Sequence, residues 1–325
     1  IAATAIWGAQ QAHLRGQGTR EGVFAMWYGK GPGLDRSGDV FRHANLAGVA
    51  PKGGVLVAMG DDHTCESSTS CHQTEITLTD AHIPVLHPAG PQEILDYTHL
   101  GWAMSRFTGC WVGFKCVKDT VEATTVVDGD PHRISVILPD YEAPPQGLNI
   151  ILGETPHQQE DRLVNWRLPA VTAFARANKL DRRMIGAPGA RIGVISSGKS
   201  WLDVLQAFAY LGIDEAEAQR LGVTAYKIGM AYPLEQEGVR EFAHGLETIA
   251  VVEEKRAFIE TQVKEALYSL PNRPTVVGKK DEQGQTLFRQ TLDLNPLEIA
   301  LSLGRELLSR SPNEQIGRAS CRARV

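Results

Sequence analysis

The fold class follows from two stretches of the sequence, VFAMWYGKGPGLDRSGD (residues 23–39) and VLVAMGDDHTCESSTSCHQTE (residues 55–75). Each begins as a short apolar run and continues into a polar loop, which is typical of a strand buried in a parallel sheet. In such sheets ligands bind at the carboxyl ends of the strands. The two loops are therefore the first candidate site.

The same alternation of strand and helix patterns continues along the chain. We expect further strands at residues 110–114, 134–138, 191–195, 223–228, 248–252 and 275–277. Helix patterns span residues 91–107, 157–178, 201–211, 259–270 and 296–308, and Pro169 should kink or split the second of these. Strands that alternate with helices predict an α/β fold with mostly parallel sheets.

The chain divides into two predicted domains. Residues 1–140 form the first, residues 141–189 a proline-rich linker with a helix, and residues 190–310 the second. Residues 311–325 show no apolar period, and their end resembles a translated sequencing adapter, so we treat them as an artefact rather than a genuine basic tail. Because the chain starts with Ile1 inside an apolar pattern, we also expect a truncated N-terminus.

Composition excludes several classes of protein. The formal net charge of -5 over 325 residues argues against nucleic acid or an anionic membrane as a partner bound by bulk charge. No apolar run is long enough for a transmembrane helix. Five cysteines in a chain of this length favour a reducing compartment, so we expect a cytoplasmic protein.

The first loop carries three glycines in five residues, Gly29, Gly31 and Gly33, around Lys30. Glycines permit positive φ angles and the close approach of a ligand. The spacing is not that of a dinucleotide fingerprint. The loop is thus either ligand-facing or a tight turn before the next helix.

The second loop contains Asp61, Asp62 and His63, followed by several hydroxyl residues. Neighbouring carboxylates and an imidazole can exchange protons or hold a charged ligand. The alternatives are an N-cap that opens a helix, and a zinc site. The spacing from Cys65 to Cys71 is not the usual metal-binding hook, so we predict no metal here.

Two motifs lie in the second domain. Residues 193–200, GVISSGKS, match the letters of a phosphate-binding loop, but Val194 and Ile195 look like strand core. A plain strand-to-helix turn, or one that holds an anion, remains open. Glu253 and Glu254 end a strand pattern and indicate either a domain interface or a solvated strand terminus.

Seven ordered motifs carry a resemblance to a known family. They are AATAIWG (2–8), WYGKGPGLDRSGDVFRHAN (27–45), GDDHTCESSTSCHQTE (60–75), GCWVGFK (109–115), ARIGVISSGKSWLDV (190–204), YKIGMAYPLE (226–235) and VVEEKR (251–256). This series resembles the long single-chain indolepyruvate ferredoxin oxidoreductases, which are thiamine-diphosphate-dependent 2-oxoacid:ferredoxin oxidoreductases.

The resemblance implies a division of labour. The first domain would be the pyrimidine-side domain of a thiamine diphosphate enzyme, and the second would resemble the transketolase C-terminal domain. The full enzyme would convert an aryl pyruvate, CoA and oxidised ferredoxin into an aryl-acetyl-CoA, CO₂ and reduced ferredoxin, and we expect a homo-oligomer. The Glu that contacts the cofactor's aminopyrimidine ring would fall just ahead of Ile1, and the groups binding Mg²⁺ and an iron–sulfur cluster would lie outside this fragment.

The resemblance also implies site residues. Lys30 or His63 would contact the 2-oxoacid, whereas the cofactor-facing positions would be Gly29, Gly31, Asp61, Asp62, Ser67 and Ser68. We expect the fragment alone to be inactive. The alternatives are an ATP-binding protein that uses Gly193–Ser200, and a non-catalytic assembly module in which the two loops lie far from any cleft.

Overall fold

The computed structural model describes residues 1–310, which form two compact α/β units. Unit 1 comprises Ile1–Leu180 together with Met230–Pro233, and unit 2 contains the remaining described residues. The prediction of two α/β domains with mostly parallel sheets is confirmed. The predicted artefact tail, residues 311–325, lies outside the described residues.

Unit 1 is built on a five-stranded sheet with the order β1-β2-β4-β3-β8. All neighbouring strands are parallel except β3 and β8. Its strands are β1 (Phe24–Lys30), β2 (Gly54–Asp61), β3 (Val85–Leu86), β4 (Val112–Val117) and β8 (Met230–Tyr232). Its helices are α1 (Ala2–Gln11), α2 (Gly31–Asp35), α3 (Gly38–Ala47), α4 (Thr74–Asp80), α5 (Pro91–Thr108), α6 (Lys118–Val121), α7 (Pro156–Arg162), the π-helix Leu163–Arg167 and α8 (Leu168–Ala177).

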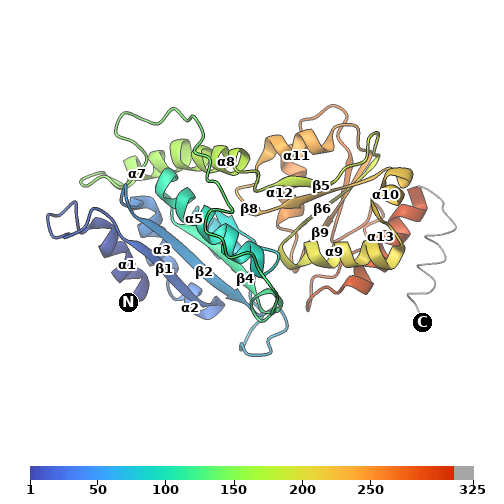
Figure 1. The fold of residues 1–325 in the computed structure, drawn as a ribbon, viewed down its shortest axis with the longest axis horizontal. Coiled ribbons are helices and arrows are strands. Elements are labelled where there is room, and N and C mark those ends of the chain that lie inside the picture. The colour runs from blue at the N-terminus through green and yellow to red at the C-terminus, as the bar shows by residue number, and fades with distance from the viewer. Residues whose placement is uncertain (311–325) are drawn as a thin grey trace. The chain divides into compact units, whose positions relative to one another are not determined.

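The core of unit 1 lies between the sheet and the helices α5 and α8 (Figure 1). Apolar side chains from four strands meet those of the two helices there, including Leu56, Leu86, Leu100, Val112 and Phe174. The predicted strand at residues 134–138 is wrong. Ile134 and Val136 pack against this core, and Asn178 bonds the backbone of Ile137, so the segment lies on the surface without a strand partner.

Residues 141–180, assigned to a linker from sequence, lie in unit 1. The buried Arg167 guanidinium donates to the carbonyl oxygens of Asn45, Leu46 and Ala47 at the end of α3, and to that of Leu148. The three carbonyls of α3 lie in its last turn, where the helix itself offers no partner, so Arg167 satisfies them. The expected split of the helix occurs as the π-helix just before Pro169, whose ring nitrogen cannot donate.

Unit 2 is built on a second five-stranded sheet, with the order β10-β9-β6-β7-β5. Only β5 is antiparallel to its neighbour. Its strands are β5 (Arg182–Ile185), β6 (Ile192–Ser197), β7 (Val223–Ile228), β9 (Thr248–Val252) and β10 (Thr275–Val277). Its helices are α9 (Gly198–Leu211), α10 (Glu215–Leu221), α11 (Gln236–Ala243), α12 (Ile259–Leu267) and α13 (Pro296–Arg310).

The helices of unit 2 cover both faces of its sheet (Figure 1). α11 and α12 pack on one face through Val239, Phe242, Ile259 and Val263. α9 and α13 contact each other on the opposite face. The strands β6, β7 and β9 are buried along their whole length, which explains their continuous apolar character. Among the described residues, none of the helices combines the length and apolar character needed to cross a bilayer.

Candidate functional site

The two loops singled out from sequence lie side by side at the rim of the unit 1 sheet. β1 and β2 are adjacent and parallel, with Lys30 opposite Gly60. The Lys30 ammonium donates to both the carbonyl oxygen and the hydroxyl of Ser67, each at 2.7 Å. The carboxyl ends of the two strands therefore bring together loops that are 37 residues apart in sequence.

Asp62 organises the second loop from within. Its Oδ1 accepts the backbone N–H of Glu66 at 3.0 Å, and its Oδ2 accepts that of Ser67 at 2.7 Å. The Ser67 N–H is the main cause that holds the pKa of Asp62 below its ordinary value, and Ser68 also contributes hydrogen bonds. Both carboxylate oxygens thus have partners inside the loop, and Asp62 positions Ser67 for the contact with Lys30.

The glycines of the first loop make room for the protein's own rings. A Cβ on Gly31 would lie 2.0 Å from the His72 ring, and one on Gly29 would lie 2.6 Å from the Trp27 ring. Neither glycine adopts a positive φ, so the conformational freedom that glycine permits is not used here. The glycines do allow a close approach, but the group that approaches Gly31 is the His72 ring of the protein itself. His72 Nε2 lies 3.2 Å from Asp35 Oδ2, and this contact joins the second loop to α2.

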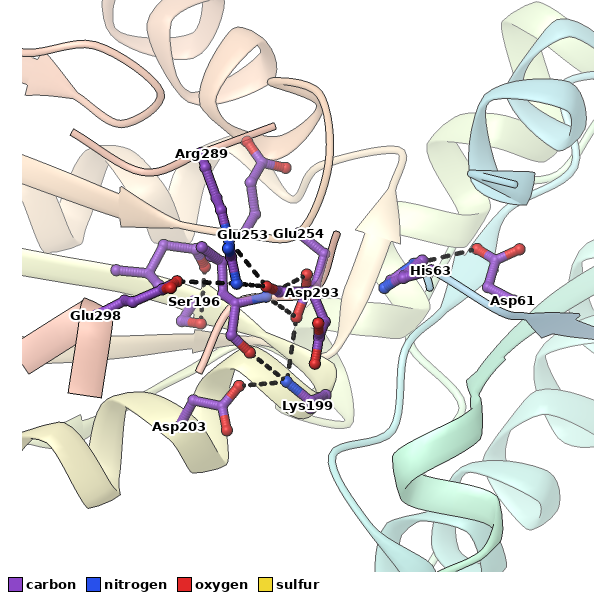
Figure 2. A network of polar contacts seen from close by, with 12 residues as sticks. Asp61, His63, Ser196, Lys199, Asp203, Glu253, Glu254, Arg289, Asp293 and Glu298 are labelled. Carbon is purple, nitrogen blue, oxygen red and sulfur yellow. Dashed lines mark hydrogen bonds and ion pairs between the residues drawn. The ribbon is translucent and has the colours of Figure 1, made fainter. Parts of the chain in front are cut away.

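A buried charge cluster lies beneath the two loops. The Lys115 ammonium, on β4, is 2.8 Å from Glu75 Oε2 and 3.6 Å from Asp61 Oδ2. His63 Nε2 lies 3.8 Å from Asp61 Oδ2 (Figure 2). Burial opposes ionisation of Asp61, but the His63 imidazole and the Lys115 charge together lower its pKa. All four side chains are buried.

Sequence reasoning missed the roles of Lys115 and Glu75. The predicted strand stopped at Phe114, which placed Lys115 after it, whereas β4 continues to Val117. The available signal was that apolar residues, Cys116 and Val117, follow Lys115, which indicates that the strand continues past it. A lysine inside a buried strand requires a charged partner, so an acidic residue nearby could have been expected.

Two buried oxygen atoms at this rim, Asp61 Oδ1 and Thr74 Oγ1, make no hydrogen bond with any of residues 1–310. An unsatisfied buried polar atom costs about 1–3 kcal/mol, so such atoms are candidate contacts for water or a ligand. An acceptor and a hydroxyl here suit a polar ring that carries an amino group.

The rim of unit 2 has a different character. The Lys199 ammonium donates to Asp203 Oδ2 at 2.8 Å, to Glu254 Oε1 at 3.2 Å and to the carbonyl oxygen of Leu294 at 2.7 Å (Figure 2). Val194 and Ile195 lie within β6, and α9 begins at Gly198. The prediction that Val194 and Ile195 are strand core is confirmed. The alternative of an ATP-binding loop at Gly193–Ser200 is not supported, because its cradle residues are strand and its lysine is engaged.

Glu253 caps a helix in this rim. Its carboxylate accepts the backbone N–H groups of Phe258, Ile259 and Glu260 at 2.8–3.1 Å. Burial raises the pKa of Glu253 to about 7, against the effect of these hydrogen bonds. Glu253 and Glu254 are both buried, which excludes the alternative of a solvated strand terminus.

Comparison with known proteins finds a matching family model and several similar proteins. Residues 182–323 match the family model described as the indolepyruvate oxidoreductase domain. The chain is 28% identical to indolepyruvate oxidoreductase subunit IorA of Pyrococcus abyssi over 255 residues, which are 75% of this chain and 36% of that protein. It is 25% identical to subunit IorA of Methanothermobacter marburgensis over 273 residues, which are 84% of this chain and 42% of that protein.

A solved structure shares the fold. The 2-oxoglutarate:ferredoxin oxidoreductase of Magnetococcus marinus, solved with 2-oxoglutarate, coenzyme A and succinyl-CoA bound, matches with a TM-score of 0.61 and 14% identity. The match covers 94% of this chain and 55% of that one. The chain spans about two fifths of the length of the curated relatives it matches.

Proposed function

We propose that this chain forms part of a thiamine-diphosphate-dependent 2-oxoacid:ferredoxin oxidoreductase. The premise is its similarity to part of the indolepyruvate oxidoreductase subunit IorA. Unit 1 would be the pyrimidine-side domain and unit 2 the transketolase C-terminal-like domain. The whole enzyme would use an aryl pyruvate, CoA and ferredoxin.

One observation carries this proposal: Lys30 and the Asp62–Ser67 loop converge at the carboxyl ends of β1 and β2, above two buried oxygens that lack partners among residues 1–310. This is the rim at which parallel sheets bind ligands. An assembly module would not need an exposed cation beside unsatisfied buried acceptors. The convergence therefore favours an enzyme over a structural module.

Each residue has a proposed task. The exposed Lys30 ammonium would bind the carboxylate of the 2-oxoacid, with Ser67 setting its position. His63, beside the ionised Asp61, would hold a proton for the reacting oxygen. Asp61 and Thr74 would hold the ring of the cofactor, which when bound supplies the carbon nucleophile and the electron sink for decarboxylation. Ser68 and the backbone at Gly29 and Gly31 would border the same place.

The test is kinetic and uses the full-length enzyme that contains this chain. Lys30→Ala should lower kcat/KM for the aryl pyruvate by about 10- to 100-fold, the worth of a hydrogen bond to a charged group. His63→Ala should lower it by about 100-fold or more, as expected for loss of an acid–base group.

Lys52→Ala is the matched control, because Lys52 is also an exposed lysine of unit 1 with an acidic partner, Glu21. It should leave kcat/KM unchanged. Thermal unfolding of each variant identifies any loss that is due to misfolding. Unchanged kcat/KM in both Lys30→Ala and His63→Ala would remove the assignment of this rim as the substrate site.

A further inference from the structure

Two thiols in the second loop lie within contact distance of each other. Cys65 Sγ and Cys71 Sγ are 3.2 Å apart and belong to residues six positions apart in sequence. Cys65 is half-buried and Cys71 is exposed. A disulfide bond measures about 2.0 Å, so the two sulfur atoms need to approach by only about 1.2 Å. The proposed catalytic function uses neither residue.

The loop is folded so that these thiols meet. Asp62 accepts the N–H groups of Glu66 and Ser67, which turns the chain directly after Cys65. At the other end, His72 Nδ1 lies 3.0 Å from the carbonyl oxygen of Ser70, and its Nε2 contacts Asp35. Both ends of the 65–71 segment are therefore fixed, and little further ordering is needed to join the sulfur atoms.

The other two described cysteines provide an internal contrast. Cys110 is fully buried and Cys116 is half-buried, and burial raises the pKa of each thiol to about 11. The thiolate is the reactive form of cysteine, so these two are protected at neutral pH. Solvent access singles out Cys71, with Cys65 next to it.

We propose that Cys65 and Cys71 form a reversible intramolecular disulfide by exchange with a low-molecular-weight disulfide such as oxidised glutathione. The Cys71 thiolate attacks one sulfur of the oxidant and releases one glutathione thiolate, which gives a mixed disulfide. The Cys65 thiolate then attacks the Cys71 sulfur and releases the second glutathione. The protein loses two protons and two electrons, and one oxidised glutathione becomes two reduced ones.

The bond would close a ring around Ser67, whose carbonyl oxygen and hydroxyl accept from Lys30. Oxidation would therefore restrain the contact that holds the Lys30 ammonium at the rim. This chemistry depends only on the loop and is independent of the proposed enzymatic function.

The experiment uses the 325-residue chain with Cys321→Ser, which removes the one cysteine outside the described residues. Samples are equilibrated in glutathione buffers from fully reduced to mostly oxidised, alkylated, and weighed by mass spectrometry. The oxidised chain should lose two alkylation sites, carry no glutathione, and yield a cross-linked 65–71 peptide. Hydrogen exchange at the Ser67 amide should slow on the order of tenfold on oxidation.

Cys65→Ser is the matched control, because it keeps the exposed thiol and removes its partner. It should accumulate a stable glutathione adduct on Cys71. Three results would overturn the proposal: glutathione adducts on the unaltered pair at the level seen in Cys65→Ser, cross-links between chains in place of an internal bond, or two free thiols remaining in the most oxidising buffer.

Discussion

Unit 1 and unit 2 both place charged side chains at the carboxyl ends of parallel strands, and the two rims differ in what those charges contact. In unit 1, Lys30 is exposed and held by neutral oxygens of Ser67, while Asp61 Oδ1 makes no hydrogen bond within residues 1–310. In unit 2, Lys199 is buried and bonded to two carboxylates and a carbonyl.

The rim of unit 1 therefore has polar groups available for a ligand, whereas the charges at the rim of unit 2 are used in internal contacts. Lys199 belongs to a letter-for-letter phosphate-loop motif, yet its donors are used within unit 2. Lys30 belongs to no standard motif, yet it remains accessible. The state of each polar atom is therefore a better guide to function than the motif that contains it.

The largest expected effect is on the buried lysine. Lys199→Met leaves Glu254 and Asp203 without their counter-charge, so the free energy of unfolding should fall by about 3–5 kcal/mol. Lys30→Met, at the exposed position, should change it by less than about 1 kcal/mol. Chemical denaturation measures both. Equal losses of unfolding free energy in the two variants would contradict the contrast between the buried lysine of unit 2 and the exposed lysine of unit 1.

Glu253 and Asp61 both lie at strand ends, and their pKa values shift in opposite directions. Between pH 4.5 and about 7, folded protein holds a proton on Glu253 that the unfolded chain has released. The unfolding free energy of the wild type, relative to Glu253→Gln, should therefore fall by about 3 kcal/mol as the pH rises through this window.

Asp61 has the opposite sign, because its pKa is lowered from 3.8. Its contribution, measured against Asp61→Asn, should be present above pH 3.8 and be lost as the pH falls through the lowered pKa. Denaturation curves from acid to neutral pH test both groups. A Glu253 contribution that grows with rising pH would contradict the assignment.

The smallest effect is expected in the loop of unit 1. Asp62→Ala removes the acceptors of the Glu66 and Ser67 amides and should cost about 1–2 kcal/mol. Hydrogen exchange at these two amides should accelerate. Asp80→Ala is the control, since Asp80 forms an exposed ion pair with Arg42 and should cost less than about 1 kcal/mol. If the two variants behave alike, Asp62 does not organise the loop.

Part of the candidate site could be read from the sequence. The neighbouring apolar runs ending in the glycine loop and in Asp61–His63 predicted adjacent strand ends, and the structure places Lys30 opposite Gly60. The pattern could not show that His72 fills the space beside Gly31, or that Lys115 pairs with Glu75. These contacts join segments 40 or so residues apart, and local periodicity reports only on near neighbours.

The sequence by itself determined the α/β class and several strands, including those at residues 223–228, 248–252 and 275–277, because hydrophobic period and turn residues act locally. Only the tertiary structure decided that Met230–Tyr232 pairs with Val85–Leu86 in the sheet of unit 1. It also decided that Lys199 is buried and Lys30 exposed. Burial and pairing of a charge depend on atoms brought together by the whole fold, and no single stretch of the chain contains them.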